Sequence, residues 1–129
     1  MLKRKAERGP VVKFTDSEKN AIKKKAKELI LPLLEEYTDI MGISYERVSF
    51  RFQKTRWGSC SSKGGLNFNA LLALCPEPVI RYVVVHELCH RKYMNHSRRF
   101  WEEVAIYMPD YKEYRLWLKK NGEGLIGRL

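Results

Sequence analysis

The sequence has no long apolar run and few cysteines. None of its apolar stretches approaches the roughly 18 residues of a membrane-spanning helix, so we expect no membrane span. The N-terminal stretch MLKRKAERGP is charged and is not followed by the apolar region of a secretory signal. Three cysteines, Cys60, Cys75 and Cys89, are too few and too oddly numbered for a disulfide framework. These features together predict a reducing, cytoplasmic location.

Acidic residues are also scarce. Fifteen aspartates and glutamates stand against 25 lysines and arginines, which gives a net charge of +10. Much of the excess lies in residues 1–27, which hold ten cations and three anions. Such a stretch can attract a nucleic acid, a nucleotide or an acidic partner. It can also be a solvated helix face behind a tail, which is the interpretation we favour.

The first predicted element is a long helix. We expect a basic tail over residues 1–14 and a single domain over residues 15–129, a size that suits one core. Thr15 and Glu18 form a capping box, and apolar residues then recur at helical spacing to about residue 39. Pro32 either kinks this helix or ends it near residue 31.

Three short strands are predicted after the helix. VSFRFQ alternates apolar and polar residues, TRWGSC reads as a second strand, and LNFNALLAL reads as a third. The glycines of SSKGG suit the turn between the second and the third strand.

Three more helices are predicted in the second half of the chain. Residues 79–93 are apolar and β-branched, but the segment is longer than a typical strand, so we expect a buried helix. Ser97 can cap a second helix that Pro109 ends, and Asp110 can cap a last helix that ends at Asn121–Gly122. One helix, three strands and three helices indicate an α+β domain.

All three histidines of the chain lie within VVVHELCHRKYMNH. His86-Glu87-Leu88-Cys89-His90 has the pattern H-E-x-x-H, and on a helix its two imidazoles lie one turn apart on one face, where both can bind one metal ion. Glu87 then lies at the flank of that face. Two histidines that bind zinc and a glutamate that moves protons are the usual roles in this pattern.

A third histidine completes the candidate site. Catalytic zinc takes three protein ligands and keeps one open position. His96 follows His90 by six residues, so the chain must turn after about Tyr93, and Asn95 suits a turn in the left-handed region. The opposing interpretation, two hydrogen-bonded core histidines and one surface histidine, leaves buried Glu87 without a compensating cation. Cys89 is a further possible ligand, although we favour a buried thiol.

Several separated motifs together resemble the YgjP-like family of small zinc metallopeptidase domains, which is similar to the SprT-like and WLM zincins. They are TRWGSCSSKGGLNFN, YVVVHELCHRKYMNHSRRFW and MPDYKEYRLWLKKNG. The resemblance implies a minimal zincin fold in which a small three-stranded antiparallel sheet packs on the active-site helix. It also implies zinc bound by His86, His90 and His96, and Glu87 as general base and acid. The segment from Leu66 to about Ala73 would pair with an extended peptide.

This chain departs from the family in its length. Family members often carry an additional N-terminal β-rich half, which is missing here, so substrate selection by that half is not carried over. The residue that stabilises an oxyanion also stays open. Its candidates are Tyr82, Tyr93, Arg98 and Arg99.

Three functions therefore remain to be weighed. The favoured one is a zinc metallopeptidase in which a zinc-bound water, activated by Glu87, attacks the scissile carbonyl of a peptide or protein. The second is a zinc-dependent phosphohydrolase of nucleotides, which the positive charge would favour. The third is a nucleic-acid-associated zinc-binding module with weak or no catalysis.

Overall fold

The computed structural model describes residues 11–129, and its helices and strands follow the predicted order. The elements are α2 (Asp16–Met41), β1 (Arg47–Arg51), β2 (Gly58–Cys60), β3 (Gly65–Asn69), the 3₁₀ helix η1 (Ala70–Leu74), α3 (Glu77–Cys89), α4 (Arg98–Tyr107) and α5 (Tyr111–Ile126). The α+β prediction is confirmed. Among the described residues, no helix is long and apolar enough to cross a membrane. Residues 1–10 of the predicted tail lie outside the described part.

The capping box at the start of α2 forms as predicted. The Glu18 amide donates to Thr15 Oγ1 at 3.1 Å, and the Thr15 amide donates to Glu18 Oε1 at 2.8 Å. The helix continues through Pro32 without a break, so it does not end near residue 31. It ends at Gly42, whose φ of 65° lies in the left-handed region that glycine adopts without strain. Its buried face covers the rest of the core.

The sheet is mixed, so the prediction of an antiparallel sheet is wrong. The strand order is β1-β3-β2, with β2 antiparallel and β1 parallel to β3. A tight turn at Gly64, with φ of 88°, joins β2 to β3. The segment 52–57 carries the chain from β1 past the position of β3 to the far edge of the sheet. Alternation of apolar residues shows which face of a strand is buried, but it does not show which neighbour the strand pairs with.

The third strand is shorter than predicted because Asn69 ends it. The Asn69 side chain is fully buried, accepts the Leu71 amide at 3.0 Å, and donates to the carbonyl oxygens of Gln53 and Arg56 at 2.8 and 3.0 Å. The amide thus starts η1 and fixes the crossing segment before β2. This segment carries part of the candidate site.

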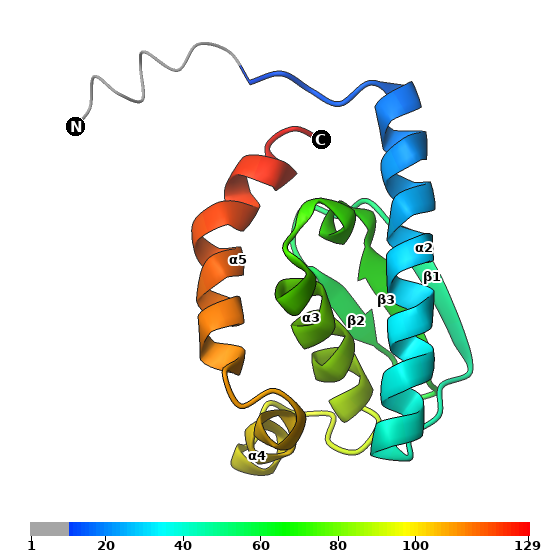
Figure 1. Cartoon of the computed structure of the whole chain (residues 1–129), viewed down its shortest axis with the longest axis vertical. Coiled ribbons are helices and arrows are strands. Elements are labelled where there is room, and N and C mark those ends of the chain that lie inside the picture. Colours follow the sequence, from blue (N-terminus) through cyan, green and yellow to red (C-terminus); the bar gives the residue numbers. More distant parts are fainter. Residues whose placement is uncertain (1–10) are drawn as a thin grey trace, which may run out of the picture.

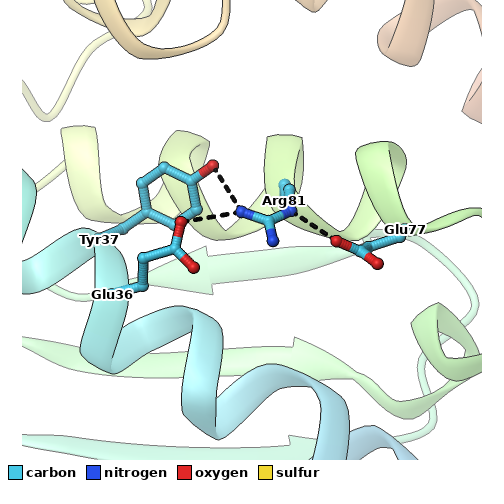
Figure 2. A network of polar contacts seen from close by, with 4 residues as sticks. All are labelled: Glu36, Tyr37, Glu77 and Arg81. Atoms are coloured by element: carbon cyan, nitrogen blue, oxygen red, sulfur yellow. Dashed lines mark hydrogen bonds and ion pairs between the residues drawn. The ribbon is translucent and has the colours of Figure 1, made fainter.

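The central helix α3 is buried on most of its surface. In Figure 1, α2 and α5 stand on either side of α3, and the sheet lies behind it. Arg81 of α3 also joins this helix to α2 at the surface (Figure 2): its guanidinium donates to Glu77 at 2.8 Å, to Glu36 at 2.9 Å and to the Tyr37 hydroxyl at 3.2 Å. The predicted helix is confirmed, although it ends at Cys89 and not at Tyr93.

The two C-terminal helices differ in how well they were predicted. Ser97 caps α4, since its Oγ accepts the Phe100 amide at 3.4 Å. Asp110 precedes α5 but makes no side-chain cap, and α5 continues past Asn121–Gly122 to Ile126. The end of α5 lies beside the start of the described chain (Figure 1), where the Phe14 amide donates to the Arg128 carbonyl at 2.9 Å.

Candidate metal centre

The three histidines converge on one point at the end of α3. His86 lies in the last turn of α3, and His90 is the C-cap residue of the helix. The chain then turns through residues 91–97, where the Tyr93 amide donates to the Cys89 carbonyl at 3.0 Å, and returns His96 to the helix end. Asn95 does not use the left-handed region, because no described non-glycine residue has a positive φ.

The ligand atoms of the histidines are spaced as a metal ion requires. His96 Nε2 lies 3.1 Å from His90 Nε2 and 3.2 Å from His86 Nε2. Ligands at 2.0–2.1 Å from a tetrahedral zinc ion are about 3.3–3.4 Å apart. One nitrogen from each of the three residues lies within 4.8 Å of the others. The geometry therefore fits a three-histidine site with a fourth, open position.

The hydrogen bonds of the other ring nitrogens support this arrangement. His90 Nδ1 lies 2.9 Å from the Tyr93 carbonyl, an acceptor, so Nδ1 carries the proton and Nε2 carries the lone pair. His86 Nδ1 lies 3.1 Å from the Tyr82 hydroxyl, which can accept its proton in the same way. Lone pairs that face one another at about 3 Å repel, and a cation between them relieves that repulsion. The donor set thus suits a divalent metal ion.

Aromatic rings hold the imidazoles from the side of α4. Phe100, fully buried, stacks on His90 with centroids 4.4 Å apart. Trp101 stacks on His96 with centroids 5.7 Å apart. Rings packed in this way leave little rotational freedom, so the site is preorganised.

The surroundings keep the imidazoles in the neutral form that binds metal. Burial and, to a smaller extent, the neighbouring His90, His96 and Arg115 together lower the pKa of His86 to about 3. Burial also lowers the pKa of His90. Because a protonated imidazole cannot coordinate a metal ion, these environments favour ligation near neutral pH.

Glu87 lies directly beside the three histidines. Its Oε2 is 4.0 Å from His86 Nε2, and its side chain is almost fully buried. Burial raises the pKa of Glu87 to about 8, and the positive charge of Arg56 opposes that shift. A bound divalent cation would lower it again. The pKa of Glu87 therefore depends on the charge next to its carboxyl group. A carboxyl whose pKa can change in this way suits general acid–base chemistry.

A glycine of β2 leaves room for this carboxylate. A Cβ on Gly58 would lie 2.9 Å from Glu87 Cγ and 3.2 Å from the Asn67 carbonyl oxygen. The strand can therefore approach α3 this closely only without a side chain. Gly58 of the RWGSC segment therefore lies directly against the candidate general base.

Two cavities flank His86 and Glu87. One, of about 310 Å³, is lined by Gly58, Ser59 and Cys60 of β2 and by Met94. The other, of about 430 Å³, lies between α3, α5 and the segment before β2. A substrate can therefore extend to both sides of the candidate metal position.

Several residues of the site were not predicted from the sequence. They are Arg56, Trp101, Arg115, Leu118 and Lys119. Of the oxyanion candidates, Tyr82 contacts His86, whereas Arg98 is 92% exposed and lies 3.5 Å from Glu102. Cys89 is fully buried, and burial raises its thiol pKa to about 12, so it is an inert core residue as favoured.

Comparisons with known proteins show what the chain is similar to. The model of the family described as "YgjP-like, metallopeptidase domain" matches residues 10–121. UTP pyrophosphatase of Escherichia coli (strain K12) is 30% identical over 75 residues, which cover 55% of this chain and 45% of that protein. The chain thus spans less than half the length of this curated relative.

Two solved structures share the fold. The metallopeptidase zymogen of Pyrococcus abyssi abylysin is similar with a TM-score of 0.62 and 31% identity, covering 70% of this chain and 93% of that chain. The metallopeptidase zymogen of Methanocaldococcus jannaschii jannalysin has a TM-score of 0.52 and 23% identity, covering 78% and 95%. At that identity the second likeness supports the fold alone.

Proposed function

The chain belongs to the YgjP-like metallopeptidase domain family and is a zinc-hydrolase-like enzyme, and from this premise we propose that it is a zinc-dependent peptidase. His86, His90 and His96 are the proposed zinc ligands, and Glu87 is the proposed general base and acid. The convergence of three Nε2 atoms beside a buried carboxyl is the observation that carries the proposal.

The protein residues have distinct tasks in this mechanism. Bound zinc would supply Lewis-acid chemistry, polarising a carbonyl and lowering the pKa of water. Glu87 accepts a proton from the attacking water and delivers it to the leaving amine. Tyr82 and the Tyr93 carbonyl hold His86 and His90 in the orientation that presents Nε2. Phe100 and Trp101 keep the rings in place.

The outer edge of β2 is the proposed place for an extended peptide. The segment 66–73 was predicted to play this role, but β3 is the central strand and η1 follows it, so neither can accept a further strand. Within the described residues β2 pairs only with β3, and Ser59 and Cys60 line the cavity that contains His86 and Glu87. A peptide added to β2 would cross the site by ordinary β-augmentation.

Metal content and one substitution test the proposal. Mass spectrometry of protein purified without a histidine tag is expected to give about one zinc ion per chain, lost or weakened in a His96→Ala variant. Glu87→Gln should retain zinc and lose hydrolysis by about 10²-fold or more. No bound metal after reconstitution with zinc would contradict the metal site. Full peptidase activity of the zinc-loaded Glu87→Gln variant would contradict the role of the carboxyl.

A nucleotide phosphohydrolase is the second candidate. Arg56, Arg115 and Lys119 line the larger cavity, and the Escherichia coli relative is a UTP pyrophosphatase. A screen of nucleoside triphosphates beside peptides separates the two reactions. Phosphate or pyrophosphate release no greater than that of a metal-stripped control would exclude the second.

The third proposal concerns a binding partner, nucleic acid, and does not concern the reaction. Lys23, Lys24 and Lys25 are exposed on α2. If they bind nucleic acid, affinity should fall as salt rises and should drop when the three are changed to glutamine. Unchanged affinity would exclude it. We also propose a cytoplasmic location, in keeping with three free cysteines.

A further inference from the structure

We propose that Arg56, Arg115 and Lys119 form an anion-binding subsite beside the metal centre, which takes a carboxylate or phosphoryl group of the substrate. The role of this subsite in substrate specificity rests on the proposed function. Binding of an anion at the subsite does not, since it can be measured without turnover.

The three cations come from separate parts of the chain and surround one cavity. Arg115 and Lys119 lie one turn apart on α5, and Arg56 lies in the segment that Asn69 fixes before β2. The cavity of about 430 Å³ that they line also contains His86 and Glu87. This volume suits a small ligand or one end of a larger one. An anion held there lies next to the candidate metal position.

Among residues 11–129, none of the three cations lies within ion-pair distance of a carboxylate. Among the described residues, the ion pairs involve Arg81, Lys92, Arg98 and His86, and not these three side chains. The one carboxyl that lines the cavity is that of Glu87, which is buried against β2. An anionic ligand would thus meet three unpaired charges.

Arg115 is held in place by aromatic stacking. Its guanidinium carbon lies 4.5 Å from the centroid of Trp101, and Trp101 in turn stacks on His96. Tyr111 stacks on the same indole with centroids 5.1 Å apart. A guanidinium fixed on an indole keeps its N–H donors free for a ligand and loses less entropy when it binds.

The concentration of positive charge at this cavity is not a simple result of the net charge. A cavity of about 760 Å³ along the end of α2 is lined by Glu35, Glu36 and Asp39 and by no lysine or arginine. A further cavity beside α2 mixes one lysine with two glutamates, whereas one of about 390 Å³ on α5 is lined by Lys112, Arg115 and Lys119 with Leu116. The excess cations therefore gather along α5, and Arg115 and Lys119 also line the cavity that contains the histidines.

The apolar residues that line the cavity indicate which kind of ligand fits it. Trp57, Val83 and Leu118 supply apolar surface between the cations. We therefore expect a ligand with an apolar or aromatic part next to its anionic group.

Calorimetric titration with inorganic pyrophosphate tests the subsite. The zinc-loaded full chain and the metal-stripped full chain are titrated in parallel, so that binding to zinc itself is distinguished from binding to the protein. Arg115→Gln should weaken the metal-independent binding by about tenfold or more, the usual effect of losing a charge-assisted hydrogen bond. Lys119→Gln should weaken it as well.

Lys120→Gln is the matched control, because Lys120 is the next residue of α5, is exposed, and lies outside the cavity. It removes the same charge and should change the affinity by less than about twofold. Equal affinities of Arg115→Gln and Lys120→Gln, or no binding of pyrophosphate to metal-stripped protein, would overturn the proposal.

Competition experiments identify the source of the anion. An acidic peptide is compared with its amide counterpart, and a nucleoside triphosphate with its nucleoside, on the zinc-loaded Glu87→Gln variant. Preference for the acidic peptide supports a carboxylate, and preference for the triphosphate supports a phosphoryl group. Equal competition by charged and neutral members of both pairs overturns the subsite. If the charged competitors bind selectively but the unmodified protein hydrolyses neither peptides nor nucleotides, the subsite is supported and only the proposed function is contradicted.

Discussion

Tyr82 is a single residue through which the affinity for metal can be tested. Its hydroxyl lies 3.1 Å from His86 Nδ1. Removing the partner of a ligating histidine commonly lowers metal affinity by about 10- to 100-fold. We expect Tyr82→Phe to lower zinc affinity by that amount while the fold is retained, measured by competition with a chromophoric chelator. Tyr45→Phe, which lies by a different cavity, is the control and should bind zinc normally.

Gly58 tests how closely β2 must approach Glu87. The added methyl group of Gly58→Ala would lie 2.9 Å from Glu87 Cγ, and the neighbouring Asn67 carbonyl belongs to the central strand and has little freedom to move. The carboxylate must therefore shift, and displacement of a catalytic group by about 1 Å costs about 10²-fold in rate. Peptidase assays at equal zinc occupancy measure the effect.

The control for this substitution lies on α5. A Cβ on Gly124 meets nothing within 4 Å, so Gly124→Ala should leave activity unchanged and raise helix stability by about 1 kcal/mol or less. Full activity of Gly58→Ala would show that the close contact with β2 does not position Glu87.

The structure brings together the candidate residues that are close in the chain. His86 and His90 are one helical turn apart, and the absence of any other histidine pointed to His96. Arg56 and Arg115 were missed because they reach the same cavity from positions about 30 residues away on either side of Glu87. Only the packing of α5 against α3 and the fixed loop before β2 bring them together. Local spacing holds no information on such contacts.

At the scale of the elements, the order of the α-helices was predictable, whereas the strand partners, the 3₁₀ helix η1 and the ends of α3 and α5 were not. The capping box at Thr15 and the cap at Ser97 are local signals, and both form. Asn121–Gly122 is a typical stop signal, yet α5 continues through it. Gly122 is buried because the Trp57 ring lies against it, and a Cβ there would be 2.6 Å from Trp57 Cζ2. This glycine serves packing between elements and does not end the helix.

Gly122 therefore tests how α5 is attached. Gly122→Ala should force Trp57 and α5 apart and destabilise the fold by about 1–3 kcal/mol, despite the higher helix propensity of alanine. Chemical denaturation measures the loss. In a Trp57→Leu background the same substitution should cost much less, because the smaller side chain leaves room. If the two substitutions lower the free energy of unfolding additively, the contact between Gly122 and Trp57 is not the cause of the destabilisation.

At the scale of the whole molecule, most of the core lies away from the candidate metal centre and meets it through Phe100 and Tyr82. The core extends from Ile22 of α2 through the sheet to Val104 of α4, and it is built from apolar side chains that do not depend on a metal ion. The three histidines lie at one end of α3, outside most of this core. This arrangement contrasts with small zinc-dependent domains that fold only with metal.

Metal removal should therefore loosen the site without unfolding the chain. In EDTA we expect an unchanged far-ultraviolet circular dichroism spectrum at 25 °C and a lower Tm. Zinc at 100 times its Kd stabilises the folded state by about 2.7 kcal/mol, which for a chain of this size is a Tm shift of about 10 °C. His96→Ala protein, which lacks one ligand, should show a much smaller shift. Unfolding of the unmodified protein in EDTA at 25 °C would contradict this expectation. It would show that the fold requires the metal ion, because the buried apolar residues alone would be insufficient to hold α3, α4 and the turn between them.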